Sequence, residues 1–232
     1  MSGACIVFSG LVARAGIIHN GLPWMPAAGA PPQPFVPGPW RFFTSAEGRA
    51  MEAVVDRIIP PDPETPGGKD AGVAVYIDRQ LAGPFGRDDG QYRSGPFHKG
   101  AKSQGAQSPL TPAEVYRKVI AALDAHCAAT YDGRAFADLD DDDKDKTIAA
   151  LEAGQISIEG VESTSFFTML LKNTREGFFA DPIYGGNRDM VGWKMIGFPG
   201  ARYDLSDWID RHNERYPHPP ISLTGAPSWD VR

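Results

Sequence analysis

Proline and glycine constrain the possible fold of this chain more than any other feature of its sequence. The 232 residues include 21 prolines and 26 glycines, and both residue types interrupt helices and strands. Residues 22–40, LPWMPAAGAPPQPFVPGPW, contain seven of the prolines. Proline fixes φ and has no backbone N–H, so this stretch is expected to be an extended arm. Regular structure is therefore confined to the segments between such stretches.

Those intervening segments carry helical signals. Thr44 with Glu47, and Thr111 with Glu114, have the spacing of a capping box, in which side chain and backbone satisfy each other at a helix start. Apolar residues then recur at helical spacing. The predicted helices cover residues 44–59, 73–81, 111–131, 141–153 and 164–179, with shorter ones at 190–196 and 205–216. Strand signals are few, at the Ile6 region and at 155–161.

The expected fold class is mainly α, a single irregular helical domain with long extended arms and loops rich in proline and glycine. Residues 1–40 are expected to be a signal-like remnant followed by the arm, 41–216 the helical domain, and 217–232 an extended tail. Ala28-Gly29-Ala30 has the form of a signal-peptidase site, but no basic region or arginine pair precedes it. An ordinary N-terminal arm is the alternative interpretation.

Composition excludes several functions. The net charge of −6 and pI near 5.4 argue against a nucleic-acid binder. No apolar run reaches the roughly 18 residues of a membrane-spanning helix. Cys5 and Cys127 are too few for a structural zinc site. They could pair with each other or with a partner chain, or stay as two free thiols.

Catalytic motifs are missing as well. The sequence contains no dinucleotide fingerprint, phosphate loop, nucleophile elbow or haem-attachment motif. The acidic run 138–145 lacks the glycine and glutamate of a calcium loop, and we interpret it as the start of the next helix. We therefore predict no catalytic, cofactor-binding or metal-binding residues in this chain. An independent hydrolase using Glu159 and Glu162 is a less favoured alternative.

Residues 178–202 are rich in aromatics, glycine and proline, and they include Arg188 and Arg202. Aromatic residues together with arginine are typical of binding hot spots. We predict core and interface positions here and on the proline-rich arm. The predicted partner-interface residues are Trp24, Phe35, Trp40, Phe178, Phe179, Tyr184, Arg188, Trp193, Phe198 and Arg202. Local structural roles are the alternative: an ion pair of Arg175 with Glu176, a helix cap at 187–189, and an exposed cation–π pair of Trp193 with Lys194. The long, aperiodic loop 83–108 could also lie over a partner.

Two motifs resemble a known family. The first is DRIIP at 56–60, followed by a loop and by GV at 72–73, which opens VYID at 75–78. The second is GFFADPIYGGN at 177–187, followed by MVGW at 190–193 and GFPG at 197–200. Over residues 42–215 the chain resembles the small subunit of gluconate 2-dehydrogenase, the subunit 3 family.

This resemblance implies an accessory role. The family's small chain accompanies a large flavoprotein of the glucose-methanol-choline type, which holds FAD and oxidises a sugar or sugar acid in the periplasm. A multihaem c-type cytochrome often completes the complex, and the small chain carries no cofactor. It usually bears a twin-arginine signal that exports both chains. Here Arg14 stands alone, which departs from that pattern. The expected function is therefore to bind, stabilise and assist export of such a dehydrogenase at the periplasmic membrane surface, with a dissociating export chaperone as the alternative.

Overall fold

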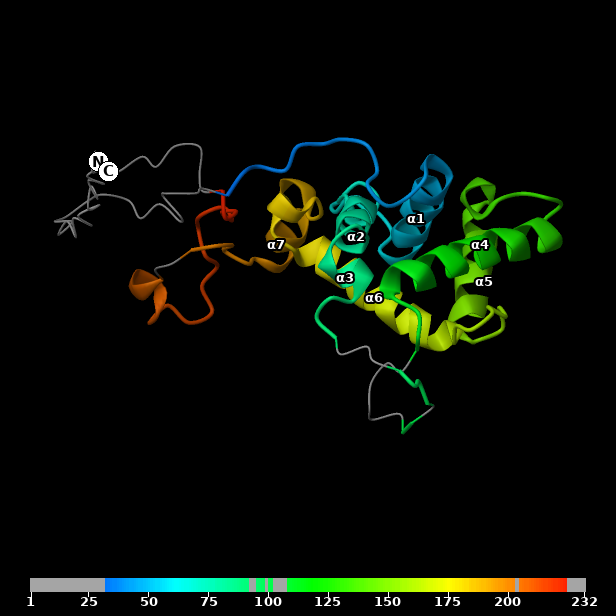
Figure 1. Ribbon diagram of the computed structural model, residues 1–232. Coiled ribbons are helices and arrows are strands. Elements are labelled where there is room, and N and C mark those ends of the chain that lie inside the picture. Colours follow the sequence, from blue (N-terminus) through cyan, green and yellow to red (C-terminus); the bar gives the residue numbers. More distant parts are fainter. Residues whose placement is uncertain (1–31, 92–94, 99, 102–107, 203–204, 225–232) are drawn as a thin grey trace, which may run out of the picture.

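A computed structural model describes residues 32–91, 95–98, 100–101, 108–202 and 205–224. Figure 1 shows an elongated row of helices, with α7 at one end and α4 and α5 at the other. The helices are α1 (Ser45–Ile58), α2 (Val73–Leu81), α3 (Pro84–Arg87), α4 (Pro112–Thr130), α5 (Asp141–Glu152), α6 (Ser163–Phe179) and α7 (Val191–Ile196). The mainly α prediction is confirmed. Within the described ranges, β pairing is limited to two isolated bridges.

Capping chemistry sets the helix starts, as the sequence predicts. The Thr44 hydroxyl accepts from Glu47 N at 3.2 Å, and the Glu47 carboxylate accepts from Thr44 N at 2.7 Å. Thr111 and Glu114 repeat this arrangement at α4. Asp140 caps α5 by accepting from Asp143 N at 2.9 Å. The acidic run therefore begins a helix, where carboxylates interact favourably with the positive end of the helix dipole.

The core lies where α2 packs against α1 and α6. Val55, Val73 and Ile77 are fully buried at this junction. Farther along α6, the rings of Tyr116 and Phe166 meet edge to face, with their centroids 5.0 Å apart. Buried hydroxyl and amide groups need partners, and Asn173 Nδ2 donates to the Tyr116 hydroxyl at 2.8 Å. None of the helices in the described residues is both long and apolar enough to cross a membrane.

The proline-rich arm is fastened to its own chain. Asp78 on α2 is fully buried, and its carboxylate accepts hydrogen bonds from the main-chain N–H groups of residues 41, 42 and 43 at 2.9 Å. The guanidinium of Arg79 pairs with the same carboxylate and donates to Pro39 O at 3.1 Å. These bonds compensate the cost of burying the carboxylate, and they fix the point where the arm enters α1.

Three local expectations were wrong. Residues 205–216 form no α-helix, because only a 3₁₀ turn at Ser206–Trp208 is present and Asn213 has a positive φ. The 155–161 segment is a tight turn with Gly160 at φ 73°, and its only pairing is the bridge from Ile158 to Val161. The 83–108 loop begins with the short helix α3. The Ile6 region lies outside the described residues.

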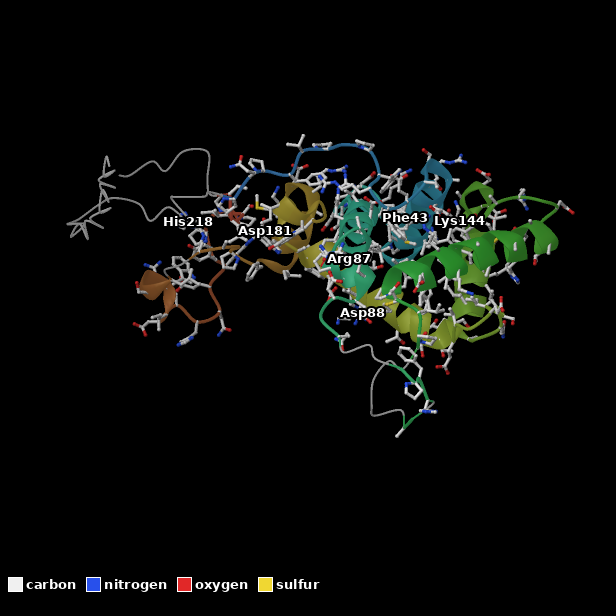
Figure 2. All side chains as sticks on the ribbon, viewed as in Figure 1. Phe43, Arg87, Asp88, Lys144, Asp181 and His218 are labelled. Atoms are coloured by element: carbon white, nitrogen blue, oxygen red, sulfur yellow. The ribbon has the colours of Figure 1, made fainter. Side chains whose placement is uncertain are left out.

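After α7 the chain leaves the helical row and then returns to it. Gly200 and Ile221 form a parallel bridge, with Ala201 N donating to Ile221 O at 2.7 Å. Figure 2 shows Asp181 beside α7, where this returning segment meets the end of α6, and His218 farther out. The end of the described chain is thus held against the α6–α7 region.

Candidate partner-binding surface

The turn between α6 and α7 is built around a buried asparagine. Asn187 is fully buried; its Nδ2 donates to Ala180 O at 2.8 Å, and its Oδ1 accepts from Gly192 N at 2.9 Å. Trp193 Nε1 donates to Phe179 O at 2.7 Å. Because each bond joins one side of the turn to the other, together they hold the end of α6 and the start of α7 in a fixed relation.

The backbone of this turn adopts conformations that few residues accept. Asn187, Asp189 and Met190 have φ values of 45°, 55° and 57°, in the left-handed region that costs energy for residues other than glycine. Gly186 passes so close to Gly177 O that a Cβ would collide with it. The turn also bonds to the segment just before α2, because Arg188 N donates to Ala71 O at 3.0 Å. A rigid, tightly packed connection results.

Large apolar side chains project from this rigid turn into solvent. We call them the α7 surface: Phe179, Tyr184, Met195, Ile196 and Phe198, which are 37%, 48%, 52%, 58% and 44% exposed. Two of them pack on buried aromatic rings. The Phe179 ring packs edge to face on Phe178 with centroids 5.2 Å apart, and the Phe198 ring packs in the same way on Trp193, also at 5.2 Å. Exposed apolar groups concentrated within twenty residues are typical of an interaction site.

Charged residues accompany the α7 surface. Arg188, Asp189 and Lys194 are exposed, and none of them takes part in the ion pairs found among the described residues. The Arg188 guanidinium lies near Gly72: a Cβ atom added to this glycine would be 3.5 Å from Arg188 Nη2. These charges are therefore available to a partner, and charges at an interface rim mainly influence association rate and specificity.

The structure divides the predicted interface residues. Phe178 and Trp193 are 1% and 5% exposed, so their side chains have almost no surface to offer a partner. These two predicted interface residues are core residues. Phe35 and Trp40 are half-buried against their own chain: Phe35 near Gly185, Trp40 against Gly48 and Phe43. Trp24 lies outside the described residues. For Phe179, Tyr184, Arg188 and Phe198, exposure agrees with the interface hypothesis, and contact with a partner stays a prediction.

Arg202 has a local role. Its Nη2 donates to Pro219 O at 2.7 Å, and its guanidinium lies 5.1 Å from the Tyr216 ring centroid. It therefore stabilises the returning C-terminal segment. Whether it also meets a partner stays a prediction.

Three small groups of residues had predicted local roles as an alternative to the interface. Glu176 pairs with Lys172 at 3.7 Å, and no pair of Glu176 with Arg175 appears among the described residues. Asn187 does bond across the start of α7, as the capping alternative proposed. The exposed Trp193–Lys194 pair is wrong, because Trp193 is buried.

Cys127 lies in the core face of α4. It is a free thiol with no exposed surface, and burial raises its pKa to about 11. A protonated thiol is a poor nucleophile, and a buried one cannot reach a partner chain. Cys5 lies outside the described residues, so pairing between the two cysteines stays untested.

Sequence reasoning missed Met195 and Ile196, the most exposed members of the α7 surface. The available signal was that both follow Trp193 in a six-residue helix, which cannot bury residues on every side. Val36 on the arm, 78% exposed, was also missed. Within the described ranges, no group of three or more His, Cys, Asp or Glu residues is placed to hold a metal ion.

The fold and this surface define a class: a small, mainly helical chain that presents apolar side chains from a rigid, internally bonded turn. A family model for gluconate 2-dehydrogenase subunit 3 matches residues 45–200, which runs from the first residue of α1 to the bridge at Gly200. The chain belongs to the gluconate 2-dehydrogenase subunit 3 family, whose description is that of a dehydrogenase subunit. Neither the curated proteins nor the solved structures gave a match.

Proposed function

We propose that this chain is a non-catalytic subunit that binds and stabilises a flavin-dependent sugar or sugar-acid dehydrogenase of the glucose-methanol-choline type. The observation that carries the proposal is the α7 surface, which lies within the family match and exposes five large apolar side chains on a rigid support. Burial of an apolar side chain of this size contributes roughly 1.5–3 kcal/mol. A partner that covers the surface would therefore bind well and would shield it from water.

The finer parts of the proposal follow the family resemblance. The partner holds FAD, a c-type cytochrome subunit is a possible third member, and this chain supplies neither group. The complex works in the periplasm, at the membrane surface, and the small chain assists export of the large one. Family membership supports the dehydrogenase complex; the compartment and the export role are proposals that need their own measurement.

Co-expression tests the proposal. The chain is produced with and without the flavoprotein dehydrogenase encoded in the same genome, and complex formation is followed by size-exclusion chromatography and flavin absorbance. We expect a complex that contains FAD, and Ile196→Asp should abolish it. Ala125→Asp, at an exposed position on α4, is the control and should leave it intact.

Two results would count against this function. One is a chain that stays monomeric beside the flavoprotein and is equally soluble in both cases. The other is turnover of a sugar with a dye acceptor by the isolated chain, which would favour an independent enzyme. A complex that forms in the cytoplasm but is absent from the mature periplasm would instead favour a dissociating export chaperone.

A further inference from the structure

The region that carries the α7 surface is basic, although the chain as a whole is acidic. Residues 172–202 contain five basic and three acidic side chains, against 23 and 29 in the full sequence. One of the three acidic groups, Asp181, is buried and accepts bonds from the returning segment. The exposed surface of the α6–α7 region therefore carries a positive net charge, and a partner that is complementary to it presents negative charge.

Arg188 lies where the α6–α7 turn, the segment just before α2 and the proline-rich arm come together. Its main-chain N–H donates to Ala71 O at 3.0 Å. A Cβ atom added to Gly72 would be 3.5 Å from Arg188 Nη2 and 2.7 Å from Gly185 O. A Cβ atom added to Gly185 would in turn be 3.0 Å from Phe35 Cε2 on the arm. The guanidinium is thus next to backbone that also meets the arm.

Exposed apolar side chains lie on both the turn and the arm beside Arg188. Tyr184, four residues earlier in the turn, is 48% exposed, and Val36, which follows Phe35 on the arm, is 78% exposed. A partner that covers both side chains would also cover the Arg188 guanidinium. Because a charge removed from water is costly unless it is paired, such a partner must bring an acceptor of opposite charge to this point.

The main chain holds Arg188 in one place. Asn187 before it and Asp189 after it have φ values of 45° and 55°, and such conformations persist only where the surrounding structure imposes them. Within the part of the chain that the structure describes, the guanidinium takes part in no hydrogen bond or ion pair. Its donors are therefore free for a partner, while little backbone freedom remains to be lost on binding.

We propose that Arg188 binds a carboxylate of the flavoprotein subunit, the side chain of an aspartate or glutamate placed beside the α7 surface. A guanidinium matches a carboxylate with two parallel N–H···O bonds, which an ammonium group cannot form. The apolar contacts around Tyr184 and Val36 exclude water from this pair. The inference rests on the proposed function, because it specifies what the partner presents to that same surface.

Binding kinetics of the complex test the assignment. Each variant of the full chain is bound to the immobilised flavoprotein dehydrogenase of the same genome. Arg188→Ala should raise the dissociation rate about thirtyfold, because it leaves the enclosed carboxylate of the partner unpaired. Arg188→Lys keeps the charge but loses the two-bond geometry, so its dissociation rate should rise less, about fivefold. Arg188→Glu brings two carboxylates together and should abolish binding.

The complex of the Arg188→Lys variant also locates the carboxylate. A carbodiimide condenses an ammonium group with a carboxylate that it touches, forming an amide bond. We expect a cross-link between position 188 and an aspartate or glutamate of the flavoprotein, identified by mass spectrometry. Arg49→Ala, which removes an exposed arginine on α1, is the matched control and should leave the dissociation rate unchanged. Circular dichroism spectra of all variants should equal that of the unaltered chain.

The outcomes separate this inference from the proposed function. A complex that dissociates at the same rate with Arg188→Ala, or that is weakened as much by Arg49→Ala, would overturn the role of Arg188 and leave the proposed function intact. A cross-link from position 188 that stays within its own chain would do the same. If the unaltered chain forms no complex, both the inference and the proposed function fail.

Discussion

The carboxylate of Asp181, at the end of α6, accepts a 2.7 Å hydrogen bond from the hydroxyl of Ser222, 41 residues farther along the chain. Its second oxygen accepts from Leu223 N at 2.7 Å. The family match ends at residue 200, so these bonds join a segment beyond the match to the α6–α7 turn within it. Asp181 itself is 8% exposed, which shields both bonds from water.

Asp181→Asn should release the returning segment. The amide keeps the size of the side chain but replaces one of the two acceptor oxygens with an NH₂ donor, which then faces the N–H of either Leu223 or Ile183. Loss of such a bond costs about 1–3 kcal/mol. We expect faster hydrogen exchange at residues 221–223, with exchange in α1 and α2 unchanged. Asp189→Asn, at an exposed position, is the control. Equal exchange in both variants would show that the bonds to Asp181 do not hold the returning segment.

Asp78→Asn should destabilise the whole domain. The carboxylate holds three main-chain N–H groups and Arg79, and its replacement leaves the guanidinium without its charged partner. Breaking a buried charge pair in this way costs roughly 3 kcal/mol. Urea denaturation followed by circular dichroism measures the loss. Asp70→Asn, exposed just before α2, should change stability by less than about 0.5 kcal/mol. A similar small effect of Asp78→Asn would show that the arm is held by other contacts.

Glu47 should make stability depend on pH in the acidic range. Burial opposes ionisation, but hydrogen bonds from Arg117 and Thr44 outweigh it and hold its pKa below the usual 4.5. A lowered pKa stabilises the folded state above pH 4.5, and that contribution is lost as the pH falls through the folded-state value. Glu47→Gln should therefore be less stable at pH 7, and the difference should shrink at pH 3. Melting temperatures at both pH values provide the measurement.

A difference in melting temperature between the unaltered chain and Glu47→Gln that stays the same from pH 7 to pH 3 would contradict this prediction. Glu52→Gln, on the same helix, controls for loss of one negative charge.

Cys127 should be unreactive in the folded chain. Burial raises its pKa to about 11 from an ordinary value of 9, so at pH 8 the thiol is protonated as well as covered. A thiol-reactive dye should label it only after denaturation. Because the raised pKa favours the protonated folded state, stability should also fall as the pH rises above about 9. Rapid labelling of the folded chain at residue 127 would contradict this account and reopen the disulfide hypothesis.

Helix positions were predictable from the sequence because their signals are local. The capping boxes at Thr44 and Thr111 and the apolar periodicity behind them involve residues within a turn or two, so α1 and α4 begin as predicted. The prediction for the 205–216 segment failed because its apolar residues were taken as a helical pattern, whereas the chain forms only a 3₁₀ turn at Ser206–Trp208 and Asn213 adopts a positive φ.

The candidate surface was only partly predictable. Phe178 and Phe179 are neighbours of identical chemistry, yet one is 1% exposed and the other 37% exposed. Their difference depends on which side of α6 faces α2 and α7, and this information lies in residues far away along the chain. Met195 and Ile196 were missed because their position in a short helix indicates that some of its residues stay exposed, but it does not indicate which ones.

The sequence by itself determined the helical class, the helix starts and the family. Apolar periodicity predicts the helices, capping residues a turn apart predict where they start, and two short motifs indicate the family. Only the tertiary structure decided that Asp78 is a buried clamp for the arm, that Trp193 supports Phe198 from below, and that Asp181 holds Ser222. These relations join residues from about 5 to 41 positions apart, and they exist because burial in a shared core forces distant polar groups to satisfy one another.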